Sequence, residues 1–238
     1  MKIAKKMNEP AWLIGTVLCA FGVVLCTKAD FGLSMMAAPP YIIHVALSKY
    51  LPWYTQGTSE YIFQALLLGI LCVLVKKFRW KYLLSFLTAV FYGVVIDLWL
   101  WVFGGSAAFA SFPGRVAGFI CGELTISLSV AFVFRTYLPP QIAECLVVEV
   151  AKHYGRDVNR IKQINDMACL ALSLILALTL TRGFTGIGVG TVVIVLVNAP
   201  LIRQWGKLLD RLFDFAPLFP ALQRALEGSA EAETGPGA

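Results

Sequence analysis

Residues 82–103 read YLLSFLTAVFYGVVIDLWLWVF, an uninterrupted run that holds a single charged side chain, Asp97. A helix needs about 20 mostly apolar residues to cross the hydrocarbon of a bilayer, so this stretch predicts a transmembrane helix. Five more runs of this kind occupy residues 11–27, 59–75, 113–134, 162–181 and 186–203. The pattern predicts an all-α membrane protein with six transmembrane helices, whose first partner is the lipid bilayer.

The composition agrees with this class. Of the 238 residues, 58% are hydrophobic and 14% charged, whereas a soluble domain is about 45–50% apolar and about 25% charged. The six cysteines lie inside apolar runs without metal-ligand spacing, which favours reduced packing residues and predicts no metal and no cofactor. The net charge of +6 comes from basic residues between the apolar runs, where they set topology, so we expect no nucleic-acid partner.

Two further apolar stretches, residues 34–48 and 138–151, are too short to span. Each opens near a Pro-Pro pair, Pro39-Pro40 in the first and Pro139-Pro140 in the second. Such interrupted segments are typical of re-entrant or interfacial helices, and the sequence leaves both alternatives open.

The distribution of basic residues supports six spans with a cytoplasmic N-terminus. Lys and Arg accumulate in cytoplasmic loops. With six spans, every Lys and Arg lies on the inner side except Lys28, Lys49, Arg115 and Arg182, which leaves 16 of 20 inside (20 − 4). We therefore expect both termini in the cytoplasm of a bacterium and the protein in its inner membrane.

A shift of 101 residues aligns the two halves of the chain. It places Gln64 on Asn165 and Asp97 on Asn198. Each half then reads span, short segment, span, span, and three crossings per half turn the second half upside down. The sequence predicts a 3+3 inverted repeat, a plan common in secondary transporters.

The predicted domain organisation follows from this repeat. The N-terminus is cytoplasmic, an amphipathic surface helix follows the second repeat, and the small, acidic C-terminal residues predict a disordered tail. The corresponding ranges are 1–10 for the N-terminus, 11–104 and 105–203 for the repeats, 204–226 for the surface helix and 227–238 for the tail.

Glu123 is the sharpest candidate for function. It lies near the middle of the predicted span 113–134, where an ionisable group costs at least about 2.5 kcal/mol on insertion scales. It is interpreted as a proton- or cation-coupling carboxylate or as a ligand for a cationic solute. The alternative is a protonated side chain that is hydrogen-bonded to a neighbouring helix or lies at an oligomer interface.

The other polar residues within the apolar segments complete the candidate site. They are interpreted as gates around a central site or as caps that satisfy the backbone groups of broken helices, and the two roles are compatible. The candidates for substrate binding or coupling, besides Glu123, are Asp97, Asn198, Gln64, Asn165, Asp166, His44, Ser34 and Glu144.

These features predict a transporter or channel for a small solute or ion. No paired-acid, His-rich or Ser-His-Asp arrangement indicates an enzyme. A second hypothesis is a substrate-binding subunit of a larger importer, docked through the small-residue stripe Ala11, Gly15 and Cys19, although ordinary packing or a homodimer would use the same stripe. A third is a membrane assembly or lipid-interacting factor.

Four stretches carry a resemblance to a known family: KADFGLSMMAAP, FRWKYLLSFLTAVFYGVVIDLW, FRTYLPPQIAE and GFTGIGVGTVVIVLVNAPLI. Over residues 10–210 the chain resembles the YczE/YyaS/YitT-type family of uncharacterised bacterial membrane proteins. The resemblance implies an inner-membrane location and brings no established substrate. Relatives often carry a Pro-Trp-Asp-type tripeptide after the Gly-Leu-Ser that ends at Ser34, where this chain has Met35-Met36-Ala37, so a contact made by that tripeptide would be absent.

Overall fold

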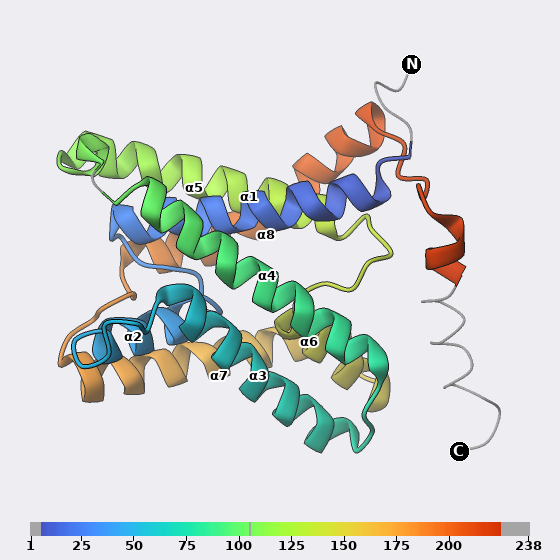
Figure 1. The fold of residues 1–238 in the computed structure, drawn as a ribbon, viewed down its shortest axis with the longest axis horizontal. Helices are drawn as coiled ribbons and strands as arrows, with labels where there is room; N and C mark the ends of the chain where they lie inside the picture. The colour runs from blue at the N-terminus through green and yellow to red at the C-terminus, as the bar shows by residue number, and fades with distance from the viewer. Residues whose placement is uncertain (1–5, 105, 225–238) are drawn as a thin grey trace.

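The computed structural model describes residues 6–104 and 106–224, which form helices joined by loops (Figure 1). The elements in chain order are α1 (Asn8–Ala29), α2 (Ala38–Leu47), α3 (Gln56–Val75), α4 (Trp80–Val102), the short η1 (Ala107–Phe109), α5 (Phe112–Val133), α6 (Ile142–His153), α7 (Val158–Leu176) with its π-helical continuation η2 (Ala177–Thr181), and α8 (Val189–Leu212).

Within these described ranges, six helices are long and apolar enough to cross a membrane. They are α1, α3, α4, α5, α7 together with η2, and α8. All six coincide with the predicted spans, so the prediction of an all-α protein with six membrane-type helices is confirmed. The short helices α2 and α6 occupy the two stretches that were predicted to be too short to span.

Local capping signals explain where several helices begin. Thr55 precedes α3, Ser111 precedes α5 and Asp157 precedes α7, and each side chain accepts a hydrogen bond from the backbone N–H three residues later. The first backbone N–H groups of a helix have no intrahelical partner, which is why such residues are favoured there.

The helices form two groups that α4 connects (Figure 1). In the first, α1 and α8 both pack on α5. In the second, α2 and α6 lie between α3 and α7 and contact both. Helix α4 packs on α1 in the first group and on α3 and α6 in the second. The start of α1 at residue 8 and the end of α8 at residue 212 lie at the same end of the molecule.

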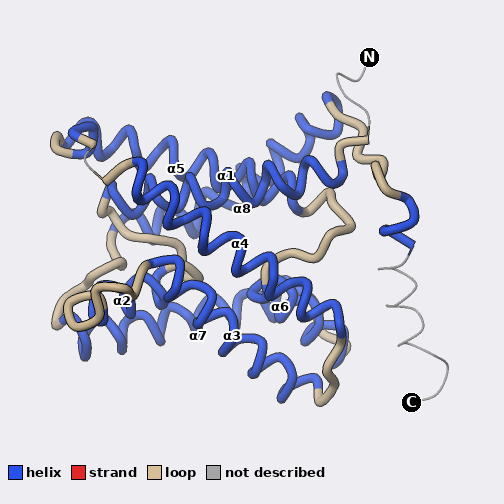
Figure 2. The backbone as a smooth tube through the Cα atoms, viewed as in Figure 1, coloured by secondary structure: helices blue, strands red, loops and turns tan. Residues whose placement is uncertain are grey.

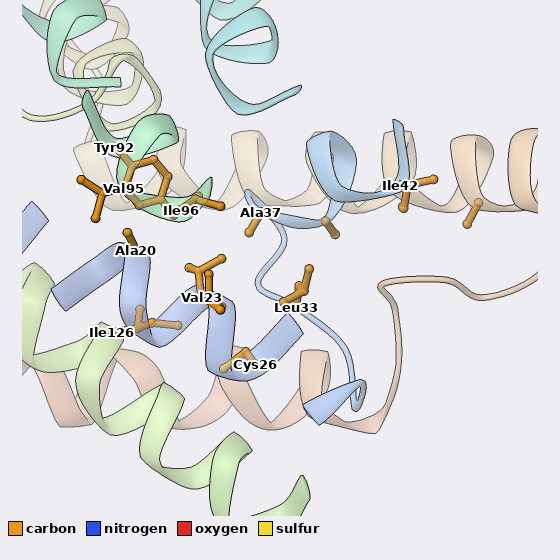
Figure 3. Packing of buried hydrophobic residues seen from close by; sticks show 13 residues of the cluster. Ala20, Val23, Cys26, Leu33, Ala37, Ile42, Tyr92, Val95, Ile96 and Ile126 are labelled. Carbon is orange, nitrogen blue, oxygen red and sulfur yellow. The ribbon is translucent and has the colours of Figure 1, made fainter. Parts of the chain in front are cut away.

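The largest core cluster joins the two groups. It holds side chains of α1, α2, α4 and α5, including Val24, Ile42 and Ile96, none of which is exposed (Figure 3). Beside it, α1 and α5 touch at Gly22 and Gly122, where an added Cβ at Gly122 would lie 2.7 Å from the Sγ of Cys26. Small residues let two helix backbones approach this closely.

The small-residue stripe on α1 packs inside the chain. Ala11 is fully buried in a cluster with Ala131 of α5, and a Cβ on Gly15 would lie 2.8 Å from Val133 and 3.0 Å from the backbone oxygen of Ser129. The stripe is therefore used for ordinary packing against α5, and its proposed role in docking a partner subunit is wrong.

Both short helices begin near the middle of the molecule and run toward opposite ends. Figure 2 shows the connecting loops turning back from the ends of α1 and α5 before α2 and α6 start. At the start of α6, Gln141 accepts a hydrogen bond from Gln64, in the middle of α3, at 2.7 Å. Just before α2, Met36 accepts one from Asn165 of α7 at 3.2 Å.

The C-terminal region differs from its prediction. Helix α8 continues beyond residue 203 to Leu212 with Pro200 inside it, and residues 213–219 form no helix. The part expected to lie as a separate surface helix is instead held to the bundle, because Arg135 at the end of α5 pairs with Asp210 at 2.6 and 2.7 Å. The predicted disordered tail, 227–238, lies outside the described residues.

Candidate functional site

A cavity of about 30 Å³ lies where α6 begins, between that helix and α1, α4 and α5. This volume holds one or two water molecules. Its lining combines hydroxyl, thiol, amide and carboxyl groups with a few apolar side chains. The lining residues are Thr16, Cys19, Thr88, Ser129, Val130, Val133, Phe134, Pro140, Gln141 and Glu144.

Two carboxyl groups from different helices interact electrostatically near this cavity. Glu144 stands in the first turn of α6, and its Oε2 is buried with no hydrogen-bond partner within the described part of the chain. Glu60 of α3 is only 4% exposed, and Glu144 is the charged group that acts on it. Burial raises the pKa of Glu144 above its usual value, with smaller opposing contributions that include the charge of Lys162.

Sequence reasoning identified Glu144 and missed Glu60. Glu60 stands at the edge of the predicted span 59–75, where a charged residue is expected at the membrane surface. One signal was available: Glu60 precedes Gln64 by four residues, so both lie on the same face of α3. Because Gln64 contacts the start of α6, this face of α3 also places Glu60 near enough to Glu144 for their charges to interact.

Cys19 of α1 lines the cavity, and Tyr92 of α4 lies near it. Cys19 lies near enough to Ser129 and Tyr92 to interact with both side chains. Tyr92 is also acted on by the charges of Glu60 and Glu144. These five residues come from five different helices, so the site is assembled by the tertiary fold.

Gln64 caps the start of α6, as the sequence allowed. Its Oε1 accepts the backbone N–H of Ala143 at 3.1 Å, and its Nε2 donates to Gln141. Asn165, the residue that the repeat aligns with Gln64, holds the corresponding place before α2 through Met36. Asp166 beside it pairs with Lys162 of its own helix at 3.5 Å and lies outside the cavity lining.

Asp97 caps α3 and lies away from the cavity. Its Oδ1 accepts the backbone N–H of Gly57 at 2.8 Å, and its Oδ2 accepts the hydroxyl of Thr55 at 2.6 Å. The capping role considered for Asp97 therefore holds, although the capped helix is α3 rather than a short one. The aligned Asn198 has a buried Oδ1 without a hydrogen-bond partner in the described ranges.

The cap makes a measurable prediction. Replacing Asp97 with alanine leaves the N–H of Gly57 without its acceptor, and we expect the free energy of unfolding to fall by about 2 kcal/mol. Asp97→Asn keeps an acceptor for Gly57 and should recover most of this loss. Thermal-unfolding midpoints in detergent, followed by circular dichroism, test the order wild type, Asp97→Asn, Asp97→Ala. Equal midpoints for the two variants would contradict it.

Glu123 is buried, as predicted, but apart from the cavity. It is 4% exposed, and neither carboxyl oxygen has a hydrogen-bond partner among the described residues. It lies on α5 next to Gly122, at the close contact with α1, near enough to Cys26 to act on that thiol electrostatically. The structure therefore does not bring Glu123 and Glu144 to one cavity.

His44 and Ser34 have local structural contacts. The Nδ1–H of His44 donates to the backbone oxygen of Tyr54 at 3.0 Å, and burial lowers the pKa of the ring below its usual value. The backbone oxygen of Ser34 accepts the N–H groups of Ala37 and Ala38 at 3.0 Å and so shapes the turn into α2. Neither residue lines the cavity.

Another buried carboxylate, which sequence reasoning did not select as a site residue, holds α6 in place. Glu149 is 5% exposed and accepts hydrogen bonds from Lys81 at 2.6 Å, Arg79 at 3.1 Å and the hydroxyl of Tyr82 at 3.1 Å. The two glutamates of α6 thus face different surroundings. Glu144 faces the cavity, and Glu149 faces the cations at the start of α4.

Comparison with known proteins places the chain in a family. Residues 7–207 match the model of a family of unknown function, DUF6198. The chain belongs to this family. A curated relative, the uncharacterized protein YyaS of Bacillus subtilis (strain 168), is 27% identical over 201 residues, which are 84% of this chain and 92% of the relative. The YyaS-type resemblance is therefore confirmed. No solved structure matches the chain.

In this DUF6198 member, the position after Gly-Leu-Ser lies near the middle of the molecule. Met36 contacts Asn165 at 3.2 Å and the thiol of Cys169 at 3.4 Å, both on α7. A side chain at this position therefore meets the central part of α7 just before α2 begins. In this chain Met35, Met36 and Ala37 occupy this place.

Proposed function

We propose that the protein is a transporter or channel for a small solute, built as a 3+3 inverted repeat with one re-entrant segment in each half. Its helices repeat the order long, short, long, long. The packing follows the same relation: α3 packs on α6 as α7 packs on α2, and α1 packs on α4 as α5 packs on α8. These pairs support the repeat, because a two-fold relation exchanges them.

One observation carries this proposal: both short helices start in the middle of the molecule, beside polar residues of a long helix. Gln64 contacts the start of α6, and Asn165 contacts the residue before α2. These are the residues that the sequence repeat aligns. Non-helical backbone at membrane depth is tolerated where it is buried in protein or lines a cavity, and broken helices form the sites of many transporters.

We place both termini in the cytoplasm and the protein in the bacterial inner membrane. Residues 8 and 212 lie at one end of the molecule, together with the loop from α3 to α4 and the loop from α6 to α7 (Figure 1). Both loops hold basic residues, Lys76, Lys77 and Arg79 in the first and Arg156 beside Asp157 in the second. The positive-inside rule assigns this end to the cytoplasm.

Glu123 is the coupling carboxylate of this proposal. A buried carboxyl without a hydrogen-bond partner among the described residues is costly, and in a membrane protein such groups mark ion or substrate pathways. Its protonation during transport would relieve the cost of burying the charge. The close α1–α5 contact beside it would transmit this change to both halves of the repeat.

A flux assay tests the function and this role together. The full chain is reconstituted in liposomes loaded with the pH dye pyranine, and amino acids, nucleosides, sugars and carboxylates are added one at a time outside. We expect one class to drive proton movement in the wild type, and Glu123→Gln to abolish it. Wild-type signals from Glu123→Gln would remove Glu123 from the mechanism. No solute-driven flux of any kind, also with radiolabelled solutes, would contradict the transport function.

A further inference from the structure

The hydroxyl groups that line the cavity donate their hydrogens to backbone oxygens of the protein. The Oγ1 of Thr16 donates to the backbone oxygen of Trp12 at 2.9 Å, and the Oγ of Ser129 donates to that of Ile126 at 2.7 Å. The Oγ1 of Thr88 donates to a backbone oxygen as well, to Leu84 at 3.1 Å or Pro139 at 3.3 Å. A hydroxyl has one hydrogen and two lone pairs, so these three groups can offer the cavity only acceptor oxygens.

The carboxyl groups add negative charge to the same place. Glu144 lines the cavity with its Oε2 unpartnered in the described part of the chain, and Glu60, 4% exposed, lies near enough to Glu144 for their charges to interact. Among the ion pairs of the described residues, none includes either carboxyl. The negative charge of one carboxylate disfavours ionisation of the other, so the pair favours binding a proton or a cation.

The other titratable groups near the pair do not supply that charge from within the bundle. Cys19 of α1 and Tyr92 of α4 are neutral or negative. On α7, Lys162 and Asp166 act on Glu144 with opposite signs. The side chain of Lys162 is 59% exposed, and its Nζ lies 3.5 Å from the Oδ2 of Asp166. Its positive charge is therefore screened by water and paired with Asp166 rather than with the carboxyl groups at the cavity.

We propose that this cavity binds a small monovalent cation, which the Glu60 and Glu144 pair exchanges for a proton. Acceptor oxygens and carboxylates are the groups that such a cation needs, and a volume of about 30 Å³ admits one ion with at most one water. A divalent ion would need a larger set of oxygen ligands, and the described residues hold no group of three His, Cys, Asp or Glu side chains suited to a metal ion. One cation enters and one proton leaves to water, so the charge of the site is conserved.

Proton release on cation binding is the test. The purified full chain is placed in detergent with a pH dye and little buffer, and NaCl, KCl or choline chloride is added at equal ionic strength. We expect Na⁺ or K⁺ to release protons and choline, which is too large, to release none. Because binding displaces one proton, the apparent affinity should rise up to about tenfold per pH unit while the pair is protonated.

Variants assign the release to this cavity. Glu60→Gln and Glu144→Gln keep the side-chain shape and should each abolish the release. Thr16→Val removes one acceptor oxygen and should weaken the apparent affinity about tenfold while the fold is kept. Asp30→Asn, at a position whose side chain is 71% exposed, is the matched control and should behave as the wild type. Each variant is first required to elute as the wild type in size-exclusion chromatography.

The cation site can be tested independently of transport. Only the role of the ion in coupling rests on the proposed transport function. No release with either ion from the wild type, or release equal to that of the wild type from both Glu60→Gln and Glu144→Gln, would overturn the cation site. Cation-linked release without solute flux in liposomes would keep the site and reject the transport function. Flux without cation-linked release would do the reverse.

Discussion

Replacing Glu149 with alanine is expected to lower the free energy of unfolding by about 3 kcal/mol, the lower end of the range for breaking a buried ion pair. The carboxylate is 5% exposed and accepts hydrogen bonds from Lys81 at 2.6 Å and from the hydroxyl of Tyr82 at 3.1 Å. Without it, the Lys81 ammonium and the buried Tyr82 hydroxyl lose this acceptor. The loss should be at the lower end because the side chain of Lys81 is 28% exposed and can reach water.

The pH dependence distinguishes this role from simple packing. Burial alone would raise the pKa of Glu149, but the hydrogen bonds from Lys81 and Tyr82 and the charges of Lys81 and Arg79 bring it below its usual value of 4.5. The stability from such a group is present above the unfolded-state pKa and is lost as the pH falls through the folded-state pKa. The difference between wild type and Glu149→Ala should therefore shrink below about pH 4.5.

Thermal-unfolding midpoints in detergent between pH 3.5 and 7.5 measure this difference. Asp30→Asn removes an exposed acidic charge and should change the free energy of unfolding by less than about 1 kcal/mol. A Glu149→Ala midpoint equal to that of Asp30→Asn at neutral pH would contradict the stabilising role. A difference independent of pH would show that the side chain acts through packing alone.

The six long helices could be predicted from the sequence because an apolar run is visible within a single stretch of about 20 residues. A run such as 82–103 needs no partner to identify it, and the Pro-Pro pairs at the two short stretches interrupt the pattern within a few residues. The polar contacts that start the short helices were partly predictable as well, since the repeat aligns Gln64 with Asn165 before any contact is known.

The candidate site could be predicted only in part, because its members meet through tertiary packing. Nothing in the sequence joins Glu60 to Glu144, which lie on α3 and α6, until the fold brings those faces together. The same reason explains the stripe of Ala11, Gly15 and Cys19. Small residues predict a close helix contact, but the sequence does not say whether the partner helix belongs to the same chain.

The crossing of α3 and α4 makes the second strong prediction, because it rests on backbone contact. A Cβ added to Gly57 would overlap the carbonyl oxygen of Gly93 and lie 2.6 Å from the Oδ2 of Asp97. A backbone oxygen cannot turn away as a side chain can, so Gly57→Ala must push the helices apart. We expect the free energy of unfolding to fall by about 3 kcal/mol, the upper part of the range for overpacking.

The same helix supplies a matched control, since a Cβ on Gly69 would meet no atom within 4 Å. Gly69→Ala should leave the midpoint unchanged or raise the stability by up to about 1 kcal/mol, because alanine favours a helix more than glycine does. Displacing α3 from α4 would also move Asp97 away from the N–H of Gly57, so the loss from Gly57→Ala and Asp97→Ala should be less than additive. Full additivity in the double variant would mean that the cap and the crossing stabilise the fold independently.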